Sequence, residues 1–188
     1  MPVEIEMEKY KMKMQFTFLG DEIDLENIQP SEINIIDIAH PLSMQCRYCG
    51  NGIKFYSVAE HCILVARMVK PEFKKLALLH DASEAYMGDL IAPMKMDCSE
   101  YLRIEKIVSD VIYKKFLGHI PGKLALEVVH DADIEIRAAE ARDNLHNKKL
   151  YTEAINKGIP IPQFKLECWD AETANLRFLE SLTGTILS

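Results

Sequence analysis

The spacing of apolar residues in "SEYLRIEKIVSDVIYKKF", residues 99–116, constrains the fold of this chain most strongly. Apolar side chains recur there three and four positions apart, which is typical of the buried face of a long amphipathic helix. They are Leu102, Ile104, Ile107, Val108, Val111 and Ile112. Helical patterns dominate from residue 31 onward, and the sequence has no internal repeat or linker. A chain of 188 residues can bury a sizeable core without a disulfide. We therefore expect one compact, all-α domain over residues 1–188.

Signals for the starts and ends of elements divide the chain further. Apolar and polar residues alternate around Gly20 and Asp21, which predicts a short N-terminal β-hairpin at about residues 14–27. A helical core is expected over about residues 31–145, with C-terminal helices to residue 188. Helices are predicted from Ser31, as the cap, to a stop or kink near Pro41; from Ser57, with Glu60 at capping-box spacing, to about Val69; and from Glu72 to about Tyr86. Three more are predicted: from Ser99 to an end near Gly118, from Pro121 to about Leu145, and from Asp170, as the cap, to about Leu182. Loops and turns are predicted at residues 47–56, 88–93 and 155–164.

The charge and the cysteines argue against several functions. A net charge of -7 is unfavourable for broad binding to nucleic-acid phosphates, which needs a basic surface. No run approaches the ~20 apolar residues of a membrane span, and "MPVEIEMEKYKMKM" has no apolar core of signal-peptide length. Five cysteines without a secretion signal favour reduced thiols in a cytoplasmic protein. Cys46 and Cys49 form a single CxxC pair, which is weak evidence for zinc.

Several ionisable side chains lie on helix faces that should be buried. His61 has apolar residues three before it and three and four after it, so it faces the core. The same test places His80, Asp81 and Asp133 on apolar faces. Alone, an inward histidine is more typical of a satisfied core side chain than of a ligand. An unpaired buried carboxylate is costly, however, and a divalent cation such as Mn, Fe, Co, Ni or Zn would remove that cost. Glu84 follows His80 by one turn, within reach of a water at such an ion.

The other histidines give weaker signals. His130 and Asp131 form a second HD dipeptide, but charged neighbours four positions away place Asp131 on a helix surface. His40 is interpreted as structural. We interpret His119 as a helix-end group, His146 as solvated, and Arg142 and Asp143 as members of surface or interhelical salt bridges.

The order His61, then His80–Asp81, then Asp133 resembles the H…HD…D pattern of HD-domain metal-dependent phosphohydrolases. "HDASEAYMGDLIAPMK" looks like a segment of the HD-type 5'-deoxynucleotidases. "DIAHPLSMQCRYCGNGIKFYSVAEH" and "AEARDNL" look like a compact group common in phages and prophages, which includes phage dATP triphosphohydrolases. The resemblance spans roughly residues 16–145 and implies a compact HD-domain helical bundle.

The resemblance also implies roles for individual residues. Glu84 would position the attacking water or carry its proton, and Asp89 would be a second acidic group near the nucleotide. Arg47 would contact phosphate, and Tyr48, where relatives often have tryptophan, would lie beside the sugar or base. Lys95 would either contact phosphate or be solvated. The ligands of a divalent Mn, Co, Zn, Mg or Fe ion would be His61, His80, Asp81 and Asp133.

The function implied is metal-dependent hydrolysis of 2'-deoxynucleotides, with dATP triphosphohydrolase activity that releases the nucleoside as the first expectation. A 5'-deoxynucleotidase acting on monophosphates is the alternative. A catalytically silent nucleotide-binding module is a third interpretation, against which the complete ligand set argues. Relatives form dimers or larger rings, so we expect a homo-oligomer. Its partner would be a deoxynucleotide, not nucleic acid or a membrane, in the cytoplasm, or in the host cytoplasm if the protein is phage-encoded.

Overall fold

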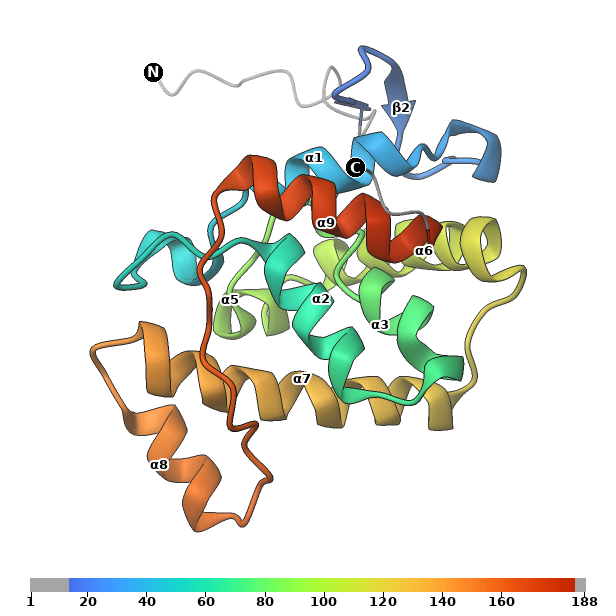
Figure 1. Ribbon diagram of the computed structural model, residues 1–188. Helices are drawn as coiled ribbons and strands as arrows, with labels where there is room; N and C mark the ends of the chain where they lie inside the picture. Colours follow the sequence, from blue (N-terminus) through green and yellow to red (C-terminus); the bar gives the residue numbers. More distant parts are fainter. Residues whose placement is uncertain (1–13, 185–188) are drawn as a thin grey trace, which may run out of the picture.

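The computed structural model describes residues 14–184, which are mainly helical (Figure 1). The predicted all-α class with a short β-hairpin is confirmed. Residues 1–13, almost all of the N-terminal stretch discussed above, and residues 185–188, the end of the expected C-terminal helices, lie outside the described part.

The N-terminal hairpin pairs β1, Met14–Phe16, with β2, Glu22–Asp24, in antiparallel register. Gly20 adopts φ +96° in the connecting turn, a conformation that favours glycine. The α-helices that follow are α1 (Ile35–Met44), α2 (Val58–Met68), α3 (Lys74–Leu79), α4 (Glu84–Met87), α5 (Ala92–Met96), α6 (Ser99–Leu117), α7 (Lys123–Asn144), α8 (Lys149–Asn156) and α9 (Ala171–Thr183). Short 3-10 helices are η2 (Pro30–Glu32), η3 (Arg47–Gly50) and η4 (Pro71–Phe73).

Helix α2 lies at the centre of the bundle. It contacts α1, α3, α7 and α9, and Figure 1 shows it between α9 and α7. Every side chain from Val58 to Ala66 is buried. Its ionisable residues Glu60 and His61 therefore need partners inside the protein, because buried polar groups are costly when unpaired.

Several elements match the sequence prediction closely. Helix α6 buries Ile104, Val108 and Ile112 and ends at Gly118, which adopts the left-handed conformation at φ +80°. Helix α9 begins where expected, since the side chain of Asp170 accepts a hydrogen bond from the backbone N–H of Thr173 (2.7 Å). The long α7 begins within two residues of Pro121 and ends at Asn144.

Of the predicted stop or kink near Pro41, the stop does not occur, and the predicted cap at Ser31 is wrong. Helix α1 continues through Pro41 to Met44, and its cap is Asn34, whose side chain accepts from the N–H of Ile36 (3.0 Å). Ser31 lies in η2 instead. Proline removes one N–H from the helix, but α1 is held on several sides by α2, α4 and α9, so packing outweighs the local penalty.

The predicted helix from Glu72 to Tyr86 is interrupted at His80. Residues 80–83 form a turn between α3 and α4. Backbone hydrogen bonds there span three residues: Ala82 N–H donates to Leu79 O (3.1 Å), and Glu84 N–H donates to Asp81 O (3.0 Å). This tighter winding is typical of 3-10 geometry, and it falls on the HD dipeptide.

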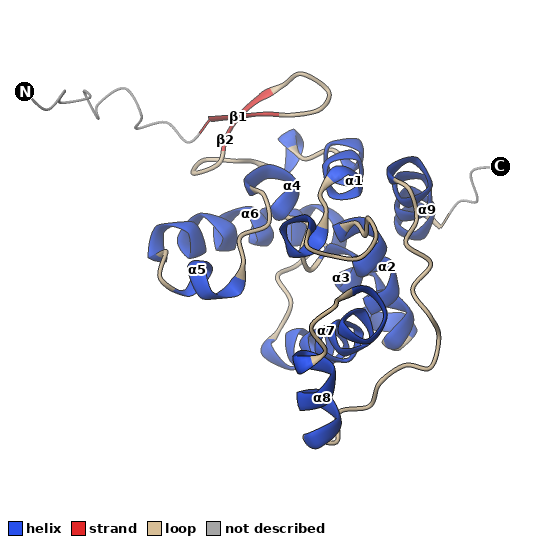
Figure 2. Ribbon diagram, turned by 90° about the vertical axis from the view of Figure 1, so that its left-hand side faces the viewer, coloured by secondary structure: helices blue, strands red, loops and turns tan. Residues whose placement is uncertain are grey.

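The segment after α7 contains a helix, α8, that was not predicted as a separate element. It contacts α7, and Figure 2 shows it at the opposite end of the molecule from the hairpin. Residues 157–170 then run without helix or strand to α9, so the predicted loop at 155–164 is correct except for the end of α8. We call residues 157–170 the C-terminal strap.

Candidate metal centre

His61 is completely buried, as its position on an apolar face predicted. Its Nδ1 atom lies 2.6 Å from Oε1 of Glu140 on α7. Burial opposes the charge on Glu140, but Arg47 and His61 outweigh it and hold the pKa of this carboxyl well below its usual range. An ionised carboxylate only accepts hydrogen bonds, so Nδ1 of His61 carries the proton. In the neutral imidazole its Nε2 atom therefore presents a lone pair.

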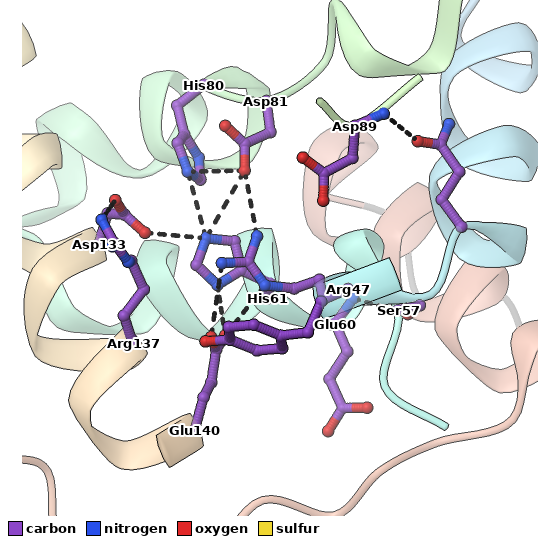
Figure 3. A network of polar contacts seen from close by, with 12 residues as sticks. Arg47, Ser57, Glu60, His61, His80, Asp81, Asp89, Asp133, Arg137 and Glu140 are labelled. Carbon is purple, nitrogen blue, oxygen red and sulfur yellow. Dashed lines mark hydrogen bonds and ion pairs between the residues drawn. The ribbon is translucent and has the colours of Figure 1, made fainter. Parts of the chain in front are cut away.

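The turn between α3 and α4 supplies His80 and Asp81. The Nδ1 atom of His80 lies 2.7 Å from the carbonyl oxygen of Ala77, which also only accepts. In the neutral imidazole, Nε2 of His80 presents a lone pair too, and it lies 3.3 Å from Nε2 of His61 (Figure 3). Oδ2 of Asp81 lies 3.3 Å from Nε2 of His80.

Asp133, on α7, approaches the same point from another side. Its Oδ1 atom lies 3.2 Å from Nε2 of His61 (Figure 3). The ligand atoms of His61, His80 and Asp81 all lie within 4.8 Å of one another. The structure thus brings three of the predicted ligands into one group and places the fourth next to it.

This group suits a divalent cation. Two imidazole lone pairs and two carboxylates converge, and both ring protons point away from the point of convergence. Such an arrangement repels itself unless a proton or a metal ion lies between the lone pairs. The mixture of imidazole and carboxylate donors is one that transition metals bind. The His61, His80 and Asp81 group can therefore hold a metal ion.

The pKa values reflect the same concentration of negative charge. Burial lowers the pKa of His80, but the Asp81 carboxylate outweighs it, so the net pKa lies well above its ordinary value. Burial raises the pKa of Asp81, but His80 and His61 outweigh it and hold the pKa well below its usual range. A metal ion and a proton therefore compete for this group, and cation affinity should fall as the pH falls.

A cavity of about 230 Å³ opens beside the group. Its lining includes two of the predicted ligands, Asp81 and Asp133, and contains every other residue that the sequence assigned to the site. Those residues are Arg47, Tyr48, Glu84, Asp89 and Lys95. A neighbouring hollow of about 610 Å³ shares Tyr48 and Ile91 with it, so the two spaces adjoin at Tyr48.

Glu84 is the most buried ionisable residue in the cavity wall. It is 6% exposed, and within residues 14–184 its Oε2 atom has no hydrogen-bond partner. Burial, followed by the charges of Asp81 and Asp89, raises the pKa of Glu84 to about 9. A carboxyl group with a raised pKa in a cavity is typical of a general acid or base.

Gln45 holds the backbone on both sides of Gly88. Its side-chain nitrogen donates to the carbonyl of Glu84 (2.9 Å), and its side-chain oxygen accepts from the N–H of Asp89 (3.1 Å). These two bonds fix the distance between Glu84 and Asp89, the two acidic residues predicted to act on the nucleotide.

Arg47 and Tyr48 enter the cavity from η3. Nη1 of Arg47 lies 3.5 Å from Oδ2 of Asp81, and its Nε atom lies 3.4 Å from Oε1 of Glu140. The phenol of Tyr48 donates to Oε2 of Glu140. Tyr48 and Cys49 both have positive φ, +58° and +51°, a conformation that non-glycine residues rarely adopt.

Lys95 lines the cavity from α5, but it also forms an ion pair with Glu105 on α6. Its ammonium lies 5.6 Å from the ring centroid of Tyr101. Lys95 was predicted either to contact phosphate or to be solvated. It lies at the cavity, as a phosphate contact requires, but its charge is already paired with Glu105.

Two residues of the site were missed in the sequence. Glu140 follows Asp133 by seven positions, which is two helical turns on the same face. The residues three and four after it, Asp143 and Asn144, are polar, so the test of apolar neighbours does not identify it. Arg137 lies between Asp133 and Glu140, lines the cavity, and places Nη1 3.7 Å from Oδ2 of Asp133. Both belong to the stripe of α7 that faces α2.

The remaining predictions for ionisable residues have mixed outcomes. His130, Asp131 and His146 are exposed as predicted, and His40 stacks on Phe18 with ring centroids 3.7 Å apart. Arg142 and Asp143 do form a salt bridge (2.7 Å), but they hold the C-terminal strap and not another helix, because Arg142 donates to the carbonyls of Pro162 (2.7 Å) and Phe164 (2.6 Å). His119, Cys46 and Cys49 belong to no metal-binding group within residues 14–184.

Known proteins place the chain in a family. Over 127 residues it is 39% identical to the uncharacterized protein YfdR of Escherichia coli (strain K12), and the match covers 68% of this chain and 70% of YfdR. The uncharacterized protein RCAP_rcc00048 of Rhodobacter capsulatus is 33% identical over 155 residues, or 77% of this chain and 74% of that protein. No family model matches the sequence. The chain belongs to the same family as YfdR.

Among the helices between residues 14 and 184, none combines the length and the apolar character that crossing a membrane requires.

Proposed function

We propose that the protein is a metal-dependent phosphohydrolase acting on 2'-deoxynucleotides. The observation that carries the proposal is the convergence of four lone-pair donors, from His61, His80, Asp81 and Asp133, beside a cavity that also holds the buried Glu84. The resemblance of the surrounding sequence to HD-domain phosphohydrolases supports it independently. Two imidazoles favour Mn²⁺, Fe²⁺, Co²⁺ or Zn²⁺ over Mg²⁺, which prefers oxygen ligands.

A divalent cation bound here would polarise a phosphoryl oxygen and make water more acidic. The side chains of the cavity have complementary tasks. Arg47 offers a planar guanidinium to two phosphate oxygens, a geometry that suits bidentate binding. Arg137 also lines the cavity and adds positive charge there.

Glu84 would handle the proton of the attacking water. Water attacks the α phosphorus in line, and the bond from phosphorus to the 5' oxygen of the nucleoside breaks. Glu84 gives the proton that it holds to the leaving 5' oxygen and takes up one proton from the attacking water, so the products are the nucleoside and the free phosphate chain. A pKa near 9 in the cation-free protein suits a group that holds a proton for part of the cycle.

We propose dATP as the first substrate, with release of deoxyadenosine and tripolyphosphate. The support is the likeness of "DIAHPLSMQCRYCGNGIKFYSVAEH" to the phage enzymes. The hollow of about 610 Å³ beyond Tyr48 offers room for a base outside the smaller cavity.

A 5'-deoxynucleotidase is the second candidate, favoured by the size of the inner cavity. Its volume of about 230 Å³ lies below the ~300–1,000 Å³ typical of ligand pockets. A space of this size accommodates one phosphate and a sugar more readily than a triphosphate.

The test is a screen of dAMP, dADP, dATP and the other deoxynucleotides with Mn²⁺, Co²⁺, Zn²⁺, Mg²⁺ and Fe²⁺, followed by identification of the products. Tripolyphosphate from dATP supports the first candidate, and phosphate released only from monophosphates supports the second. Nucleotide binding without turnover under every metal would overturn both and favour a silent binding module.

Variants assign the roles within that screen. Asp81→Ala should lose cation and activity together, whereas Glu84→Ala should keep the cation and lose ~10²–10⁴-fold in turnover. Asp131→Ala, in the exposed HD dipeptide on α7, is the matched control and should behave like the parent. Parent rates in both site variants would contradict the assignment.

A further inference from the structure

Glu140 is fully buried and contacts both halves of the site. Its Oε1 atom lies 2.6 Å from Nδ1 of His61, and its Oε2 atom accepts from the phenol of Tyr48. Nη2 of Arg47 lies 3.4 Å from the same Oε2 atom. One carboxylate thus contacts a residue of the cation group and both residues of η3 that line the cavity.

The contact between Glu140 and His61 determines where a cation can bind. Because Glu140 accepts the Nδ1 proton, the lone pair of His61 is confined to Nε2, which points at His80 and Asp133. A carboxylate behind a metal-binding histidine fixes the tautomer and the ring orientation in this way. Between residues 14 and 184, Glu140 is the only hydrogen-bond partner of Nδ1 of His61.

The side toward η3 holds an unfavourable backbone. Tyr48 and Cys49 are consecutive non-glycine residues at positive φ, and such conformations persist only where the surroundings enforce them. Helix α7 supplies that restraint twice. Glu140 holds the side chains of Arg47 and Tyr48, and Asn144, one turn later, accepts from Lys54 N–H (2.8 Å) and donates to its carbonyl (3.1 Å).

We propose that Glu140 is the positioning residue that couples the cation group to the phosphate-binding segment. Its Oε1 atom fixes His61, and its Oε2 atom accepts from Tyr48 and from Nη2 of Arg47. Nε of Arg47 also lies 3.4 Å from Oε1, as an ion-pair contact. The part that concerns phosphate rests on the proposed function. Loss of Glu140 should therefore weaken two binding events that involve different atoms, and a substitution that keeps one acceptor should separate them.

Glutamine is that substitution, because its amide has a single accepting oxygen. With a metal on Nε2, Nδ1 of His61 has to carry a proton, so the amide oxygen of Glu140→Gln should face His61. The amide nitrogen then faces Tyr48, whose hydroxyl can accept, and Arg47, whose guanidinium cannot. Cation binding should survive in this variant, and phosphate binding should not.

Glu60→Gln provides the matched control. Glu60 is also a fully buried glutamate of the bundle, beside His61 in sequence, but its carboxylate accepts from the N–H groups of Cys168 (3.0 Å) and Trp169 (2.7 Å). Figure 3 shows it directed away from His61. It matches the burial and charge of Glu140 without contacting the cation group.

The experiment measures binding of Mn²⁺ by calorimetry, then of inorganic phosphate to the Mn²⁺-loaded protein, in the parent, Glu140→Ala, Glu140→Gln and Glu60→Gln. We expect Glu140→Ala to weaken Mn²⁺ about 10–100-fold and to weaken phosphate as well. Glu140→Gln should stay within about tenfold of the parent for Mn²⁺ while losing phosphate affinity to a similar degree as Glu140→Ala. Glu60→Gln should match the parent for both ligands.

A spectroscopic readout separates positioning from general damage. Imidazole ¹⁵N NMR of the protein in EDTA should show His61 as the Nδ1–H tautomer in the parent and in Glu60→Gln, and a changed tautomer signal in Glu140→Ala. Parent-like Mn²⁺ and phosphate affinities in Glu140→Ala would overturn the inference while leaving the proposed function intact, and so would equal weakening by Glu60→Gln. A parent protein that binds no Mn²⁺ would overturn both.

Discussion

Replacing Glu84 by glutamine should abolish hydrolysis and yet make the folded protein more stable. The pKa of Glu84 is raised from an ordinary 4.5 to about 9 in the folded state, by burial and by the charges of Asp81 and Asp89. Between these two pH values the folded state holds a proton that the unfolded state has released. Stability therefore decreases as the pH rises from about 4.5 to about 9. Each pH unit above 4.5 is worth ~1.4 kcal/mol, which amounts to about 3 kcal/mol at pH 7.

Glutamine has nearly the same shape and no charge to lose, so the variant should escape this cost. Urea unfolding in EDTA, at pH 5, 6, 7 and 8, measures the free energy of unfolding of both proteins. The variant should exceed the parent by under ~1 kcal/mol at pH 5 and by about 3 kcal/mol at pH 7. Glu72→Gln, at an exposed position in η4, is the control and should follow the parent. A stability gap that does not change with pH, or a less stable Glu84→Gln, would refute the reasoning.

Two further predictions concern packing. Phe178→Ala removes a fully buried ring from α9, so the free energy of unfolding should fall by about 3–5 kcal/mol, measured by urea unfolding, while Mn²⁺ affinity stays at the parent value because α9 carries none of the cation group. Gly52→Ala should lower the free energy of unfolding by about 1–3 kcal/mol in the same assay and weaken phosphate binding. The reason is that its new Cβ would lie 2.7 Å from Nδ2 of Asn144 and 2.9 Å from the carbonyl oxygen of Lys54. An unchanged phosphate affinity would contradict the restraint that Asn144 is expected to impose on this segment.

The cation group was predictable because it violates the apolar pattern around it. His61 and Asp133 each occupy a helix position at which the neighbouring residues are apolar, and periodicity alone is enough to detect this. The same test does not detect Glu140, because Arg137, Asp143 and Asn144 occupy three of the four positions that lie three and four residues away from it.

The interruption at His80 was not predictable from local signals. Residues 76–86 contain neither glycine nor proline, and their apolar spacing suits one continuous helix. Contacts with distant parts of the chain act on this segment, such as the bond from Gln45 to the carbonyl of Glu84, and its local sequence does not reveal them. Glu60 shows the same limit. The N–H of Glu60 donates to the side chain of Ser57 (3.1 Å), as capping-box spacing predicts. The carboxylate of Glu60, however, binds the N–H groups of Cys168 and Trp169, more than 100 residues away.

Glu60 and His61 link the C-terminal strap to the cation group through α2. These two consecutive residues of α2 face different neighbours, one the backbone of the strap and the other the cation group. In Figure 1 the strap passes from α8 to α9 across the bundle. The amide hydrogens of Cys168 and Trp169 can exchange with solvent only when Glu60 releases them. Their exchange rates therefore report how often the strap separates from Glu60 on α2. They can be measured without nucleotide or metal.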